Sequence, residues 1–299
     1  PREVQTIIKE VRPEAMCSVP RFFEKVYAGV QEKIDNFSPI LKCVINRAIS
    51  TGRKHQLDYV NKGLTPPFFL NLRFKLYDRT IFNLLKKVVG IENGLIFPCA
   101  GAYLSDKITE FMRSVNIPLV IGYGLSETTA TVSCFQPIGF EIGTVGQVMP
   151  DVQVRIGEDD EILVKGATIT REYYKKPQAT ADAFTSDGFL RTGDAGSLTP
   201  DGSIILKERI KDLYKTSNGK YIAPQQLEGR LMDDPLIEAA IVIADQRKYV
   251  TALVIPDFVE LAKYAAKHQI PSGQPEELIT RKEIIELYES RIESIQNEF

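Results

Sequence analysis

Short apolar runs separated by longer amphipathic stretches organise the first half of the chain. Three runs have the length and composition of buried strands, and helical patterns fill the sequence between them. The runs are MCSV at 16–19, GLIFPCAGA at 94–102 and PLVIGYG at 118–124. This alternation is typical of a sheet whose parallel strands are covered by helices. It predicts an α/β domain over residues 1–147.

The pattern changes near residue 148, where short strands and turns replace the helical stretches. Asp201-Gly202 is a hairpin signal between two of these strands. An antiparallel β subdomain over residues 148–210 is therefore expected, with strands near 152–157, 161–166, 188–198 and 201–206. A third pattern begins after residue 210. It predicts a small, incomplete α+β domain over 211–299, with a hairpin-like stretch at 212–223, a helix at 224–232 and strands at 238–244 and 249–256.

Composition narrows the classes of function. The 299 residues exceed the usual size of one domain, and 37 basic against 39 acidic residues give a net charge of −2, so nucleic acid is not an expected partner. Four cysteines without a CxxC pair, and only two histidines, argue against a zinc site or a disulfide framework. No apolar run approaches the roughly 18 residues that a membrane-spanning helix needs. These features favour a cytoplasmic protein.

The candidate chemistry begins with IGYGLSETTA at 121–130, which follows an apolar run. The third glycine of a dinucleotide-binding fingerprint is absent, and GLSET ends in threonine where a serine hydrolase motif ends in glycine. The stretch suits a nucleotide better. Tyr123 offers a flat ring to a base, Ser126 and Thr128 offer hydroxyls to phosphate, and Glu127 offers an oxygen ligand to Mg²⁺. An ordinary turn closed by a capping hydroxyl is the alternative.

Four motifs then follow one another along the chain: CAGAYLS at 99–105, GYGLSET at 122–128, FLRTGD at 189–194 and ERIKDLYKTSNGKYIAPQQLE at 208–228. Their order and spacing resemble those of the adenylate-forming (AMP-binding) superfamily. Two further segments, RPEAMCSVPRFFEKVY at 12–27 and LYDRTIFNLLKKVVG at 76–90, resemble its long-chain fatty-acyl-CoA synthetase branch. The resemblance implies an α/β large domain with a β-rich subdomain, followed by a small, mobile C-terminal domain.

The resemblance also implies roles for individual residues in binding ATP or AMP. A carboxylate suits a ribose diol because it only accepts hydrogen bonds, whereas a guanidinium only donates them. The implied contacts are Gly101, Ala102 and Tyr123 at the adenine, Ser126 at the α-phosphate, Glu127 at Mg²⁺, Asp194 at the ribose and Arg209 at the ribose or phosphate, with Gly124, Thr128 and Lys215 completing the nucleotide site. Most members have threonine where Ser126 stands.

Two further implications concern coenzyme A. Lys211 corresponds to the hinge about which the small domain rotates between half-reactions. The stretch Ser217, Asn218, Gly219 and Lys220 corresponds to the segment that lines the channel for coenzyme A. An exposed basic strand is the alternative interpretation of Lys211, Lys215 and Lys220.

The implied activity is the ATP-dependent ligation of a long-chain fatty acid to coenzyme A through an acyl-adenylate, with release of AMP and pyrophosphate. The family's phosphate loop and its catalytic lysine have no counterpart in the chain, so the sequence is expected to be an inactive piece of a longer enzyme. Another acyl- or aryl-CoA ligase of the superfamily, or a non-catalytic nucleotide-binding module, remain as alternatives.

A mixture of aromatic, leucine and basic residues at 65–88 raises the question of a membrane surface. The same pattern is typical of an amphipathic helix packed on its own domain, and this second interpretation is the one that the sequence favours. Peripheral contact with the inner face of a membrane stays a hypothesis at this stage.

Overall fold

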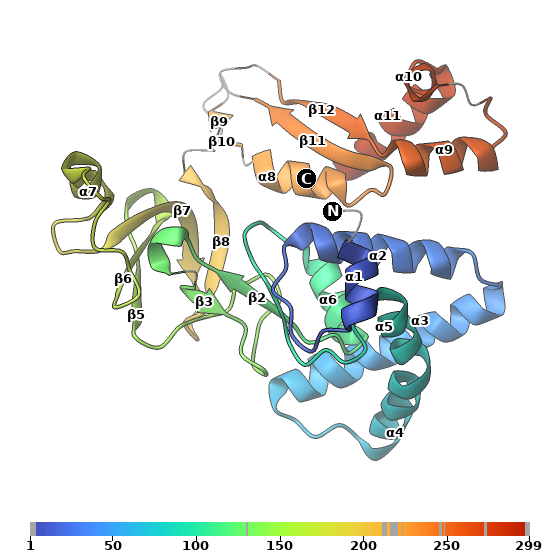
Figure 1. Ribbon diagram of the computed structural model, residues 1–299, viewed down its shortest axis with the longest axis horizontal. Helices are drawn as coiled ribbons and strands as arrows, with labels where there is room; N and C mark the ends of the chain where they lie inside the picture. The colour runs from blue at the N-terminus through green and yellow to red at the C-terminus, as the bar shows by residue number, and fades with distance from the viewer. Residues whose placement is uncertain are drawn as a thin grey trace. The chain divides into compact units, whose positions relative to one another are not determined.

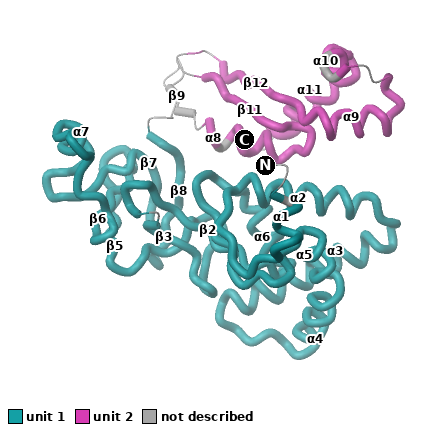
Figure 2. Tube along the Cα trace, in the orientation of Figure 1, with its two compact units in different colours: residues 1–210 teal, residues 211–299 magenta. Residues whose placement is uncertain are grey.

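The structure, a computed structural model, describes residues 4–129, 131–210, 214–215, 221–222, 224–244, 247, 249–271 and 274–296. The chain divides into two compact units, residues 1–210 and residues 211–299 (Figure 2). Each unit has its own hydrophobic clusters. No helix among the described residues is both long enough and apolar enough to cross a bilayer.

The first half of unit 1 is mostly helical, and its apolar positions recur at the spacing that buries one helix face. Helix α2 begins at a proline, whose fixed φ suits the first helical turn, and α5 ends at Gly90, which adopts the left-handed conformation. The elements are α1 (Val4–Val11), α2 (Pro20–Asp35), α3 (Pro39–Arg53), the π-helical η1 (Lys54–Tyr59), η2 (Val60–Lys62), α4 (Phe68–Tyr77), the π-helical η3 (Asp78–Phe82), α5 (Asn83–Val89) and α6 (Asp106–Ser114).

A four-stranded mixed sheet lies among these helices (Figure 1). Strands β1 (Phe97–Cys99) and β2 (Leu119–Tyr123) are parallel, as the sequence predicts, whereas β3 (Ser133–Cys134) and β4 (Gln147–Val148) are antiparallel additions. The expected strand at 16–19 is not formed. Ala15 and Ser18 make only isolated parallel bridges, to Ile96 and Cys99, so this segment lies along the free edge of β1 without becoming a regular strand.

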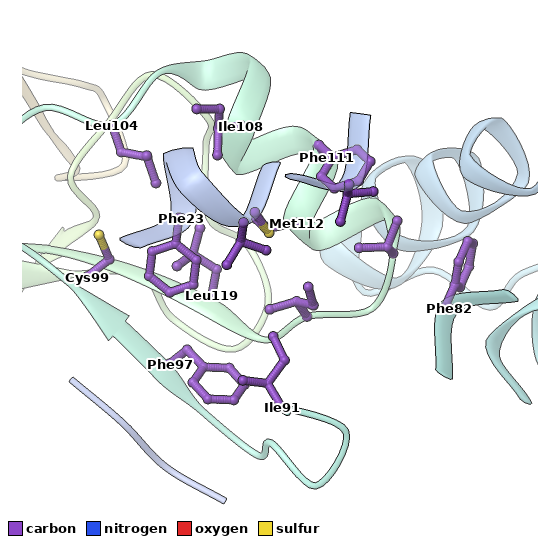
Figure 3. Packing of buried hydrophobic residues seen from close by; sticks show 14 of the residues in the cluster. Phe23, Phe82, Ile91, Phe97, Cys99, Leu104, Ile108, Phe111, Met112 and Leu119 are labelled. Carbon is purple, nitrogen blue, oxygen red and sulfur yellow. The ribbon is translucent and has the colours of Figure 1, made fainter. Parts of the chain in front are cut away.

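The core of unit 1 fills the space between the parallel pair and the helices. Phe97 and Leu119 come from the two strands and are fully buried, as are Phe23 on α2 and Met112 on α6 (Figure 3). Burying side chains of this size contributes about 1.5–3 kcal/mol each. The packing therefore fixes the parallel pair, and with it the loops that leave the strands.

The second half of unit 1 is the expected antiparallel sheet. Its strands are paired in chain order as β5 (Val152–Ile156), β6 (Glu161–Gly166), β7 (Leu190–Leu198) and β8 (Ile204–Arg209), with η5 (Glu158–Asp160) and α7 (Pro177–Ala183) in the connections. Leu198 pairs with Ile204 across the turn that contains Asp201-Gly202, which confirms the predicted hairpin. Tyr123 and Val132 pack into the core of this sheet.

Unit 2 follows the predicted α+β pattern, and its strands pair as two antiparallel hairpins, β9 with β10 and β11 with β12. Tyr288 donates its hydroxyl hydrogen bond to the Leu236 carbonyl at 2.7 Å, which ties the last helix to the start of β11. The elements are β9 (Tyr214–Lys215), β10 (Tyr221–Ile222), α8 (Pro224–Met232), β11 (Ile237–Ile243), β12 (Thr251–Pro256), α9 (Phe258–Lys267), α10 (Pro275–Leu278) and α11 (Lys282–Gln296).

The segment 65–88 differs from its expected form. It breaks into α4, η3 and α5, and it packs inward through Phe74 and Phe82. Phe74 stacks on the buried His55 ring at 3.8 Å, and Asn71 Oδ1 lies 3.2 Å from His55 Nε2. The opposite face keeps Phe68, Phe69, Leu72 and Leu76 exposed. The segment therefore packs on its own domain, as the preferred interpretation expects, but these four side chains take no part in that packing.

Helices α3 and α6 approach closely at Gly52, where an added Cβ would overlap the backbone carbonyl of Ser114. Because backbone cannot move aside as a side chain can, Gly52→Ala should lower the free energy of unfolding by about 1–3 kcal/mol. Gly29→Ala in α2 is the matched control, since its new Cβ would meet open space. This control should raise the free energy by about 0.5–1 kcal/mol. Urea denaturation followed by circular dichroism measures both, and changes of the same sign would contradict the close approach.

His55 should make the fold sensitive to mild acid. Burial lowers the pKa of His55 from 6.5, and its Nδ1 is buried with no hydrogen-bond partner among the described residues. The unfolded chain therefore binds the proton more readily, so the contribution of His55 is complete above about pH 6.5 and is lost progressively as the pH falls toward its lower folded-state pKa. Melting temperatures at pH 7.5 and 5.0 should differ less in His55→Gln than in the unmodified chain. In His268→Gln the full difference should remain.

Candidate functional site

Two of the loops identified in the sequence analysis begin at the carboxyl ends of neighbouring parallel strands. Cys99 on β1 pairs with Ile121 on β2 in parallel register, so the chain emerges from both strands in the same direction. Gly101 and Ala102 follow β1 in an exposed bend, where Gly101 has a φ of +96° that favours glycine. The turn 124–129 follows β2. In α/β sheets, ligands bind outside the carboxyl ends of parallel strands, and both loops lie there.

The turn after β2 is closed by Thr128. Its Oγ1 accepts a hydrogen bond from the Leu125 N–H at 2.9 Å and donates one to the Leu125 carbonyl at 3.0 Å. Thr128 is fully buried, whereas Ser126 is exposed and Glu127 is half-buried within η4 (Ser126–Thr128). Of the two hydroxyls proposed for a phosphate, Ser126 faces solvent and Thr128 shapes the turn.

Asp194 brings together two residues that are distant in the sequence, Tyr123 and Arg209. Its Oδ2 accepts a hydrogen bond from the Tyr123 hydroxyl at 2.6 Å, and its Oδ1 accepts one from Arg209 Nε at 3.2 Å. The Asp194 side chain is 7% exposed, while that of Arg209 is 55% exposed. Tyr123 belongs to the mixed sheet, whereas Asp194 and Arg209 lie opposite each other on β7 and β8.

The local sequence explains how Asp194 reaches this position. The register of β6 against β7 shifts between Glu161, which pairs with Ala195, and Leu163, which pairs with Arg191. Extra residues on one strand create a bulge, and Gly193 accommodates it with a φ of +71°. Gly193 of the RTGD motif therefore provides the backbone conformation that places the Asp194 carboxylate.

The electrostatics of the cluster fix the protonation of its hydroxyl. Burial, followed by the adjacent Asp194 carboxylate, strongly raises the pKa of Tyr123. The phenol therefore stays protonated and donates to Asp194. Only 7% of Tyr123 is exposed to solvent. The predicted stacking of adenine on its ring could therefore use only this small exposed part.

Glu127 has a partner that the sequence analysis missed. Tyr173 donates its hydroxyl hydrogen bond to Glu127 Oε1 at 2.9 Å, and this hydrogen bond raises the pKa of Tyr173. The segment before Tyr173 is also tied to the turn, because the Thr170 N–H donates to the Glu127 carbonyl at 2.7 Å. Nothing near Tyr173 marks it locally as a partner, since Glu127 lies 46 residues earlier. Only the folded chain brings the two together.

Several predicted residues fall outside what the structure describes. Lys211 and the stretch Ser217, Asn218, Gly219 and Lys220 lie outside the described residues. Lys215 is described only through its backbone, which pairs with Tyr221 in the β9–β10 hairpin of unit 2. Their proposed roles stay predictions.

Comparison with known proteins agrees with the motifs. The sequence pattern of the AMP-binding enzyme family matches residues 1–174, and that of the AMP-binding enzyme C-terminal domain matches residues 211–272. A long-chain-fatty-acid–CoA ligase of Mycobacterium tuberculosis, FadD15, is 33% identical over 246 residues, which are 82% of this chain and 40% of that protein. Long-chain-fatty-acid–CoA ligase 3 of Saccharomyces cerevisiae is 32% identical over 278 residues, or 87% of this chain and 37% of its own length.

Solved structures support the fold. The adenylation domain of a carboxylate reductase from Mycobacterium chelonae superposes with a TM-score of 0.67 at 21% identity, covering 97% of this chain and 40% of that one. The corresponding domain from Segniliparus rugosus, solved with AMP and a co-purified carboxylic acid, gives 0.62 at 21% identity, covering 99% and 41%. The chain thus spans about two fifths of the length of these relatives. With a family pattern over more than half of its residues, it belongs to the AMP-binding enzyme family.

Proposed function

We propose that this chain forms part of an AMP-forming long-chain fatty acid–CoA ligase. The observation that carries the proposal is the meeting of Tyr123, Asp194 and Arg209, three residues from three motifs, in one hydrogen-bonded cluster. The curated relatives named above as long-chain-fatty-acid–CoA ligases support the substrate class. A cytoplasmic location is part of the same proposal.

The chemistry of the cluster supports nucleotide binding as the proposed role. Each carboxylate oxygen of Asp194 accepts one protein hydrogen bond and has a second lone pair left for a ribose hydroxyl. Arg209 is half exposed, so its remaining N–H groups are available to the ribose or a phosphate. The loop Gly101–Ala102 and the ring of Tyr123 would border the adenine, while Ser126 and Gly124 would lie toward the α-phosphate.

Magnesium fits the same turn. Among the described residues no group of three or more His, Cys, Asp or Glu side chains is arranged to hold a metal. Mg²⁺ usually takes only one or two protein carboxylates together with substrate phosphates, and Glu127 supplies one such carboxylate. When bound, the ion would neutralise charge on the phosphates. The Tyr173 hydroxyl would keep Glu127 oriented toward them, since it holds one of its oxygens.

The proposed reaction has two steps. The fatty carboxylate attacks the α-phosphorus of ATP, pyrophosphate leaves, and the resulting acyl-adenylate reacts with the thiolate of coenzyme A, which displaces AMP. The protein's contribution is positioning and stabilisation of charge rather than a covalent intermediate. Lys211 would be the pivot between the steps, and the stretch Ser217–Lys220 would line the coenzyme A channel, with Lys215 near the nucleotide. This chain alone, which spans about two fifths of the length of its relatives, is not expected to complete the reaction.

The substrate class is tested by ATP–pyrophosphate exchange in a protein that contains this chain at the full length of its relatives. Exchange that rises with the length of a saturated fatty acid supports the long-chain assignment. Exchange driven by aryl or short acids would instead support another ligase of the family. Nucleotide binding without exchange for any acid would favour a non-catalytic binding module.

The ribose assignment predicts a selective loss. The chain should bind AMP more tightly than 2′-deoxy-AMP, because Asp194 would accept from the 2′-hydroxyl. In Asp194→Asn the affinity for AMP should fall by about 1–3 kcal/mol, and the preference over 2′-deoxy-AMP should shrink. Titration calorimetry measures both ligands. Asp182→Asn on the exposed face of α7 is the control and should change neither. An unchanged preference in Asp194→Asn would remove Asp194 from the ribose site.

The hinge assignment predicts that proline and alanine act differently at position 211. The boundary between the two compact units lies between residues 210 and 211. Proline fixes φ near −65° and restricts the preceding residue, so Lys211→Pro should block rotation between the half-reactions. In the full-length ligase it should preserve acyl-adenylate formation while reducing thioester formation by orders of magnitude. Lys211→Ala keeps the pivot free and should retain both. Equal losses in the two variants would assign the effect to the side chain instead.

A further inference from the structure

One face of α4 is apolar and turned to solvent. Phe68, Leu72 and Leu76 recur every four residues and Phe69 lies beside them, so at 100° per residue they cover an arc about 100° wide. The exposed fraction is 74% for Phe68, 75% for Phe69, 56% for Leu72 and 60% for Leu76. We call these four residues the α4 face. Large apolar side chains gathered in this way are unusual on a soluble domain and indicate an interaction surface.

The orientation of this face is fixed by the inner side of the helix. Phe74 is buried and stacks on His55, and Asn71 lies within hydrogen-bonding distance of the same ring. In Figure 1, α4 lies at the periphery of unit 1, beside α3. The two phenylalanine rings of the face contact each other edge to face, with centroids 5.6 Å apart. A helix anchored through one side thus presents its other side as a preformed apolar surface.

Positive charge surrounds the α4 face. Arg73 and Lys75 fall on its two borders in the helical projection, and Arg79 follows one turn beyond. All three are exposed, and none forms an ion pair within the described part of the chain. Between residues 59 and 91 the sequence has six basic residues, Lys62, Arg73, Lys75, Arg79, Lys86 and Lys87, against one acidic residue, Asp78. Lys86 pairs with that single carboxylate at 3.0 Å.

We propose that the α4 face docks on an anionic lipid surface, with its phenylalanines and leucines entering the headgroup region and its flanking cations contacting lipid phosphates. On such a surface the apolar side chains can enter the bilayer boundary while the bordering Arg and Lys side chains bind anionic headgroups. The local excess of positive charge, in a chain whose net charge is −2, favours a negatively charged partner. This proposal does not depend on the ligase assignment.

The absence of tryptophan in the chain allows a direct test. Phe69→Trp introduces a single indole into the α4 face, and Tyr174→Trp introduces one at an equally exposed aromatic position beside Lys175 and Lys176. Vesicles of phosphatidylcholine with phosphatidylglycerol should shift the emission of the Phe69→Trp variant to the blue, and brominated acyl chains should quench it. The Tyr174→Trp variant should show neither effect. Equal responses of both variants, or no response of Phe69→Trp, would overturn the proposal.

Charge and apolarity are then separated by paired variants. Arg73→Gln/Lys75→Gln should weaken binding to the anionic vesicles about 25-fold, at roughly fivefold for each cation. Lys267→Gln/Lys282→Gln removes the same charge from unit 2 and should leave binding unchanged.

The apolar contribution is tested separately. Leu72→Glu should abolish binding, whereas Ile40→Glu at an exposed position of α3 should retain it. Equal binding to vesicles of phosphatidylcholine alone would overturn the anionic specificity. Blue-shifted emission of the Phe69→Trp variant without vesicles, accompanied by a doubled mass in sedimentation, would show that a second copy covers the face and would overturn the lipid assignment.

Discussion

The candidate site depends on the hydrogen bonds that the buried carboxylate of Asp194 accepts. This carboxylate accepts from Tyr123 on the mixed sheet and from Arg209 on the neighbouring antiparallel strand, so a single side chain links the two sheets of unit 1. A buried charge is costly unless it is paired and hydrogen-bonded, and both conditions are met here. Replacing either partner would leave the carboxylate undersatisfied, which couples the stability of the region to the geometry proposed for the ribose.

Rigid packing behind the site complements this polar contact. The parallel strands β1 and β2 are enclosed by large buried side chains from α2 and α6 (Figure 3), and the loops that carry Gly101 and Glu127 leave their common edge. Glu127 receives a second restraint from Tyr173. The proposed nucleotide contacts at Gly101 and Glu127 therefore lie on short loops that begin at strands held by a close-packed core, as preorganised binding requires.

The α4 face has a different physical origin. Its position follows from a helix that has apolar residues on two opposite sides. One of these sides packs through Phe74 against His55. The remaining apolar residues are left exposed between cations, in contrast with the ordinary surface, where single apolar side chains are scattered. A ligase that acts on long acyl chains would benefit from such a surface, because its substrate partitions into membranes. The two proposals are nevertheless carried by separate residues.

The sequence by itself determined the elements whose pattern is local: the parallel strands β1 and β2, the Asp201-Gly202 hairpin, and helix α8 at its predicted bounds. It also supplied the motif residues Tyr123, Asp194 and Arg209, because their order along the chain resembles a family. Only the tertiary structure decided which of these residues are in contact. It also decided that the Thr128 hydroxyl forms hydrogen bonds within its own turn and that the Tyr173 hydroxyl donates a hydrogen bond to Glu127. It also decided which side of α4 is buried. Hydrophobic periodicity reports that a residue can be buried, whereas contacts across 46 or 71 residues depend on how the sheets and helices pack, which no local pattern encodes.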